Sequence, residues 1–148
     1  MAKFIYRMQN ILDIKLKLES QAKIAYSQAN AALREEEAKL LKLFERKNTY
    51  DNRAKELVEG KIDLLEIKTC RQAIESMKVL IRRQMMQVQV AEKNVEAAMQ
   101  KLEEVMKERK TQEKLREKDF EEFKQQLAQE DNKVVDELVS YNYGRSKK

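Results

Sequence analysis

Residues 74–105 decide the fold and read IESMKVLIRRQMMQVQVAEKNVEAAMQKLEEV. Positions at alternating spacings of three and four residues carry nine apolar side chains and one glutamine: Ile74, Met77, Ile81, Gln84, Val88, Ala91, Val95, Ala98, Leu102 and Val105. An apolar seam of this period, sustained over more than four heptads, is typical of a coiled-coil helix. The stretch therefore predicts a long amphipathic helix that packs along another helix.

An earlier apolar seam precedes this stretch and predicts a first helix. Its members recur at helical spacing and shift by one position near residue 32: Met8, Ile11, Leu18, Ala22, Ala25, Ala29 and Ala32, then Leu33, Leu40, Leu43, Tyr50, Ala54 and Leu57. A drift of one residue over many turns is what a straight helix with 3.6 residues per turn produces. We therefore expect helix one to be straighter than an ideal coiled-coil strand.

Glycine and proline are nearly absent, because the 148 residues include two glycines and no proline. Gly60 follows the first seam and suits the position just after a helix, where a left-handed conformation favours glycine. Two capping-box patterns follow, one beginning at Asp63 and one at Thr69. We place the start of helix two at Thr69, because the regular seam begins just after it, and its end at Gly144.

These signals predict an all-α fold, a long antiparallel two-helix coiled-coil hairpin forming a single domain. Helix one should cover about 4–58, the turn about 59–68, helix two about 69–143 and a basic tail 144–148. Helix two exceeds helix one by roughly 20 residues. Its distal part carries apolar residues that the hairpin leaves without a partner: Phe120, Phe123, Leu127, Val134, Val135, Leu138 and Val139. Such a stripe predicts a partner protein or self-association.

The composition excludes most chemistry. The chain has no histidine and a single cysteine, Cys70, which we expect to be mostly buried. There is no phosphate-binding loop, no calcium loop and no uncompensated basic run for nucleic acid. We therefore expect no enzyme activity, no cofactor, no metal, no small-molecule substrate and no nucleic acid. The absence of an apolar run near 18 residues predicts a chain without a membrane span, located in the cytoplasm.

One segment interrupts the seam of helix two. Residues 107–119 contain a single apolar residue, Leu115, among many charges. The segment is either a solvated part of the helix or a charged docking surface.

Three stretches carry a resemblance to a known family. Residues 4–15, FIYRMQNILDIK, resemble the start of flagellar export proteins of the FliJ family. Residues 108–123, ERKTQEKLREKDFEEF, and residues 131–138, DNKVVDEL, are similar to the C-terminal signature of that family. The resemblance covers essentially the whole chain.

The resemblance implies a soluble component of the flagellar type III protein export apparatus, serving motility and chemotaxis. Its fold would be similar to the central stalk of rotary ATPases. Its partners would be the hexameric export ATPase FliI, whose turnover it would stimulate, the export-gate protein FlhA, and export chaperones that it would escort. It would lie in the cytoplasm, peripherally associated with the inner membrane at the flagellar base.

The resemblance also implies two sets of contact residues. Contacts with the ATPase would come from the paired ends of the helices: Phe4, Arg7, Met8, Ile11, Phe120, Phe123, Leu127 and Leu138. Contacts with the export gate would lie nearer the turn: Leu43, Tyr50, Met77 and Leu80. The sequence departs from the family pattern at Arg46 and Ala73. For Leu43 and Met77, the competing interpretation is simple packing between the helices. For Arg7, it is a solvated charge that contacts no partner protein.

Two other functions fit the same pattern. One is a structural coiled-coil protein that self-associates without any connection to an ATPase. The other is a stalk protein of a virulence-type secretion system or of a rotary ATPase. The effect of the protein on the hydrolysis rate of a FliI-type ATPase separates the export function from the structural one.

Overall fold

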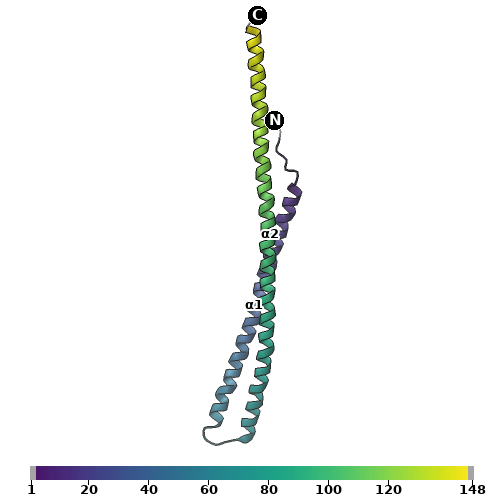
Figure 1. The fold of residues 1–148 in the computed structure, drawn as a ribbon. Helices are drawn as coiled ribbons and strands as arrows, with labels where there is room; N and C mark the ends of the chain where they lie inside the picture. The colour runs from purple at the N-terminus through teal and green to yellow at the C-terminus, as the bar shows by residue number, and fades with distance from the viewer. Residues whose placement is uncertain (1–2, 147–148) are drawn as a thin grey trace. The chain divides into compact units, whose positions relative to one another are not determined.

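A computed structural model describes residues 3–146 of the chain, and the described part consists of two α-helices and no strand (Figure 1). Helix α1 spans Gln9–Leu57 and helix α2 spans Leu64–Ser146. The helices pack extensively on one another, which confirms the predicted all-α helical hairpin. The chain divides into two compact units, one formed by Gln21–Glu103 and the other by Met1–Ser20 with Glu104–Lys148.

The turn between the helices forms around Gly60, as the sequence predicts, and occupies residues 58–63. Gly60 has a φ of +89°, in the left-handed region that side chains with a Cβ rarely adopt. A Cβ added at this position would meet no atom within 4 Å. The backbone conformation, and not space, therefore requires glycine here.

Helix α2 begins at Leu64, so the predicted start at Thr69 is wrong. The carboxylate of Asp63 accepts hydrogen bonds from the backbone N–H of Leu65 at 3.0 Å and of Glu66 at 3.4 Å. These bonds satisfy N–H groups that a helix start leaves without partners. Thr69 lies inside the helix, where its hydroxyl donates to the carbonyl of Leu65 at 2.9 Å. Asp63 therefore caps the helix, and the helix continues without a break from Leu64 through Thr69.

The outer ends of both helices also differ from the prediction. Helix α1 begins at Gln9 and not near residue 4. Residues 3–8 form a non-helical lead-in, and the N–H of Gln9 donates to the carbonyl of Tyr6 at 3.1 Å where the helix starts. Gly144 does not end α2, which continues to Ser146 without a left-handed residue there. A single helical glycine costs only about 1 kcal/mol relative to alanine. Residues 147 and 148 of the predicted basic tail lie outside the described part.

The apolar seam predicted for α2 is the one that packs. All ten of its positions are buried or half-buried, and Met77 and Val105 are each only 2% exposed. Cys70 extends this seam and is buried as expected, with its thiol donating to the backbone carbonyl of Tyr50 at 3.3 Å.

The seam predicted for the first half of α1 is wrong at five of its seven positions. Ala22 and Ala29 are covered as predicted, and so is the continuation from Leu33 to Leu57, but Ala25 and Ala32 are exposed. Met8, Ile11 and Leu18 are each 37–38% exposed. The covered positions run back from Leu57 with unbroken spacings of three and four: Ala54, Tyr50, Lys47, Leu43, Leu40, Glu36, Leu33, Ala29, Tyr26, Ala22, Glu19, Lys15 and Leu12. The helix therefore keeps the 3.5-residue period of a coiled coil and shows no drift. Apolar character alone gave the wrong phase, because four covered positions carry charged side chains.

One polar contact lies within the seam of Gln21–Glu103. The side-chain amide of Gln84 donates to the backbone carbonyl of Glu36 at 2.9 Å and also to the carboxylate of Glu36. The amide hydrogen bond from Gln84 lowers the pKa of Glu36 more than desolvation raises it, and the nearby Lys39 ammonium adds a smaller lowering effect. The ionised form of Glu36 is therefore favoured in the folded state.

We expect Gly60→Ala to destabilise the hairpin by about 1 kcal/mol, because alanine must adopt the left-handed conformation. Gly144→Ala is the matched control, since Gly144 is helical and also has no atom within 4 Å of an added Cβ. Urea unfolding followed by circular dichroism measures both. Equal effects of the two substitutions would contradict the assigned role of Gly60.

We expect Glu36→Gln to remove part of the acid sensitivity of the fold. Because the pKa of Glu36 is below its ordinary value of 4.5 in the folded chain, its stabilising contribution is complete above that pH and is lost as the pH falls through the folded-state pKa. The difference in free energy of unfolding between the natural protein and the variant should therefore shrink on acidification. Glu37→Gln, at an exposed neighbour, should keep the natural pH dependence; identical profiles for both variants would refute the assignment.

Candidate functional site

An aromatic cluster fixes the N-terminal lead-in to α2. The ring of Phe4 lies 5.0 Å from that of Phe120 in an edge-to-face arrangement and 5.5 Å from that of Phe123. The Arg116 guanidinium lies 5.7 Å from the centre of the Phe4 ring, and the Lys124 ammonium 4.6 Å from the centre of the Phe120 ring. Such aromatic and cation–π contacts anchor a segment that has no helix of its own.

Arg7 lines a shallow hollow beside this cluster, together with Phe4 and Phe123. Its side chain is exposed, as are those of Met8 and Ile11. The structure thus brings Arg7 beside the aromatic cluster, while Met8 and Ile11 present apolar surface to solvent.

The charged segment 107–119 is neither freely solvated nor a purely external docking surface, because several of its side chains bond to the first residues of the chain. Arg109 contacts both carboxylate oxygens of Glu19, at 2.7 and 3.3 Å, and Glu19 is only 6% exposed. Lys15 pairs with Glu108 at 2.8 Å, and the hydroxyl of Tyr6 donates to Gln112 at 3.1 Å. Polar contacts therefore accompany the buried apolar residues of this unit, among them Leu12 at 5% and Val105 at 2% exposure.

The Glu19–Arg109 pair is the most covered ionic contact of this interface. Hydrogen bonds from Arg109 to Glu19, and then to Glu113 at 2.9 Å, raise the pKa of Arg109 against the opposing effect of desolvation. Sequence analysis missed Glu19, although the heptad spacing continued back from Leu57 would have placed it at the interface. A covered ion pair is costly to break by removing one partner, so it fixes the register of the two segments.

The distal part of α2 is helical but uncovered. Leu127 is half-buried, and every residue from 128 to 144 is exposed. Aliphatic residues share one side of this segment with exposures of 55–61%: Val134, Val135, Leu138 and Val139. We call these four residues with Leu127 the distal stripe. Its members recur at helical spacing, as an apolar face that contacts another helix does.

The predicted gate residues near the turn lie at different depths. Met77 is 2% exposed, so its side chain serves the packing between α1 and α2. Leu43 and Tyr50 are half-buried, and Leu80 is 39% exposed. Of the four, Leu80 offers the most surface to a partner.

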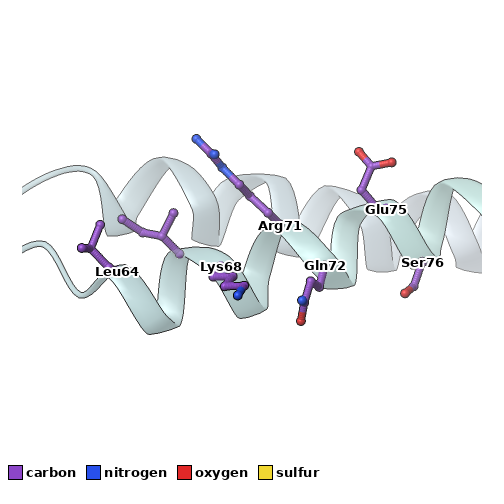
Figure 2. A pocket seen from close by; sticks show the side chains of 7 residues that line it. Leu64, Lys68, Arg71, Gln72, Glu75 and Ser76 are labelled. Carbon is purple, nitrogen blue, oxygen red and sulfur yellow. The ribbon is translucent and has the colours of Figure 1, made fainter.

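A hollow on the first turns of α2 was not anticipated from the sequence. Its lining includes Leu64, Ile67, Lys68 and Arg71. Figure 2 shows Arg71 and Glu75 pointing to one side of the helix and Gln72 and Ser76 pointing to the other. The sequence signal that could have indicated this hollow is Leu64 followed at helical spacing by the cations Lys68 and Arg71.

Within residues 3–146, no helix is long and apolar enough to cross a membrane. The same residues contain no group of three or more acidic or cysteine side chains arranged to hold a metal ion.

Comparison with protein families matches residues 4–148, essentially the whole chain, to the family described as "Flagellar FliJ protein". No curated protein sequence and no solved structure matches the chain.

Proposed function

Since the chain belongs to the flagellar FliJ protein family, and so is a component of flagellar type III export, we propose that it acts there as a stalk. In this proposal it engages the hexameric export ATPase FliI and stimulates its turnover, contacts the export gate FlhA and escorts export chaperones. It performs no catalysis of its own.

The observation that carries the proposal is the distal stripe. Exposed aliphatic side chains on a regular helix lose the stabilisation that burial provides, about 25 cal/mol for each Å² of apolar surface. Leu127, Val134 and Leu138 follow one another at spacings of seven and four residues, so they lie on one face of α2. A surrounding protein ring could cover such a face, as the central cavity of an ATPase hexamer would.

The lead-in of the chain adds to the same surface. Phe4 holds residues 3–8 against Phe120 and Phe123, and Phe120 remains 38% exposed. Arg7 stands beside this cluster as an exposed cation. The ATPase contact that we propose therefore combines an aromatic patch and a cation with the distal stripe.

The gate contact is proposed for the region near the turn. Leu80 is its main apolar contact, flanked by the half-buried Leu43 and Tyr50. Met77 acts indirectly in this arrangement, because its side chain maintains the packing that holds Leu80 in place.

Chaperone escort and a peripheral position at the membrane base of the flagellum belong to the proposal through family membership alone. A stalk role in a virulence-type secretion system is the neighbouring alternative, and the choice of ATPase in the assay below distinguishes it.

We expect the full chain to raise the ATP hydrolysis rate of a purified flagellar export ATPase. Val134→Ser/Leu138→Ser should abolish this stimulation, because it removes apolar surface from the proposed contact. The matched control is Gln129→Ser/Lys133→Ser, which changes two exposed polar residues of the same segment. Circular dichroism checks that all variants remain helical.

An unchanged hydrolysis rate together with the absence of a complex on a sizing column would overturn the ATPase part of the proposal. Equal losses in the two double variants would show that the distal stripe is not the contact surface.

We expect Leu80→Glu to weaken binding to the purified cytoplasmic part of an export-gate protein without changing the urea midpoint. Met77→Ala should instead lower the stability, by about 2 kcal/mol or more, because it leaves a cavity between the helices. Calorimetric titration and urea unfolding measure the two effects. Gate binding that is indifferent to Leu80→Glu would remove this residue from the contact.

A further inference from the structure

The molecule carries a second exposed surface near the turn. One part of it is the hollow on the first turns of α2 that Figure 2 shows. A neighbouring hollow is lined by Phe44 and Lys47 from α1 and by Lys78, Ile81, Arg82 and Met85 from α2. Phe44 and Met85 are each 43% exposed. We call the cationic and apolar residues of these two hollows the basic strip: Phe44, Lys47, Leu64, Ile67, Lys68, Arg71, Lys78, Ile81, Arg82 and Met85.

The charge of the basic strip is strongly one-sided. Five of its members are cations, and the hollows include one carboxylate, Glu75. Lys47 is paired with Asp51 at 2.8 Å and Lys78 with Glu75 at 3.1 Å. Lys68, Arg71 and Arg82 are exposed and add three further positive charges. An occupant of this strip therefore has to combine apolar side chains with acidic ones.

A segment with that chemistry exists in the same chain. Residues 127–141 of α2 hold the distal stripe and four carboxylates, those of Glu130, Asp131, Asp136 and Glu137, against one lysine, Lys133. The segment thus has a net charge of −3. It is an acidic amphipathic helix with its apolar side exposed.

The dimensions of the two surfaces are compatible. At about 1.5 Å per residue, the basic strip extends for about 32 Å along α2 and the acidic segment for about 21 Å. The hollow lined by Phe44 and Lys47 lies between α1 and α2, whereas the hollow of Figure 2 is lined by α2 alone. An amphipathic helix can lay its apolar face into an apolar groove of the first kind. The acidic segment would lay its aliphatic side chains on the exposed Phe44 and Met85, with its carboxylates toward the cations of the strip.

We propose that the basic strip binds the acidic distal segment of a second copy of this chain. The occupant is a second copy because the acidic helix that complements the strip in charge, apolar character and length belongs to the protein itself. Self-association then covers the distal stripe, so it competes with any other partner of that stripe. The inference uses only surfaces of this chain and does not depend on the proposed ATPase contact.

The experiment uses two charge-reversal variants of the full chain. One, Arg71→Glu/Arg82→Glu, lowers the net charge of the strip members from +5 to +1; the other, Asp131→Lys/Glu137→Lys, changes the net charge of the distal segment from −3 to +1. Lys42→Glu/Arg83→Glu is the matched control, because these cations are exposed and lie outside the strip. Sedimentation equilibrium at about 1–100 µM protein, a range that brackets weak interfaces, measures the mass against the 17.6 kDa of one chain.

The natural protein should show a mass that rises with concentration and falls with added salt, since the Debye length shortens from about 10 Å at 0.1 M to about 3 Å at 1 M. Each reversal variant alone should bind itself at least about tenfold more weakly, because the charge attraction between the strip and the distal segment is then weakened or reversed. The control should associate as the natural protein does. An equimolar mixture of the two reversal variants should recover association, since each then offers the surface that the other lacks.

Three results would overturn the inference. The natural protein could remain at the mass of one chain throughout, which would leave the strip to an acidic helix of another protein. Association could survive both reversals or fall equally in the control. The mixture could stay unassociated while circular dichroism shows both variants to be fully helical.

Discussion

The structure depends on one constraint: two helices can bury each other's apolar surface only where both are present. Helix α1 has 49 residues and α2 has 83, so α1 cannot cover all of α2. Nearer the turn the seam closes over Met77, Ile81 and Val88. Beyond Leu127 every described residue up to 144 is exposed. The unequal helix lengths thus give the chain both a packed hairpin and an apolar face that α1 does not cover.

In the unit formed by the two ends of the chain, ion pairs and aromatic contacts contribute to the packing between the segments. The buried Leu12 and Val105 are joined there by the Glu19–Arg109 pair, by Lys15–Glu108 and by the aromatic cluster around Phe4. An exposed ion pair such as Lys15–Glu108 contributes little net stability and weakens with salt, whereas the covered Glu19–Arg109 pair is costly to break by removing one partner. A segment held by exposed ion pairs opens at a lower free-energy cost than a segment held by a packed apolar core. The surface proposed for the ATPase therefore adjoins the less apolar interface of the molecule.

Sequence reasoning succeeded where apolar periodicity and backbone chemistry agree. It identified all ten positions of the α2 seam and the turn at Gly60, because a heptad pattern and a left-handed glycine are local signals. It failed in the first half of α1, where Leu18 is apolar yet exposed and Glu19 is charged yet covered. It also chose Thr69 over Asp63, since two capping boxes six residues apart look alike. The 39% exposure of Leu80, which lies beside the seam, required the helix pairing itself, which no single helix reveals.

Amide hydrogen exchange of the full chain, alone and with the purified flagellar export ATPase, tests the central claim most directly. Without the ATPase, at a protein concentration low enough to keep the chain unassociated, residues 74–105 should exchange slowly and residues 127–143 rapidly. Addition of the ATPase should slow exchange in residues 127–143 and leave residues 74–105 unchanged. Slow exchange of residues 127–143 in the isolated chain, or no change in them on adding the ATPase, would contradict the claim that the distal stripe is an uncovered contact surface.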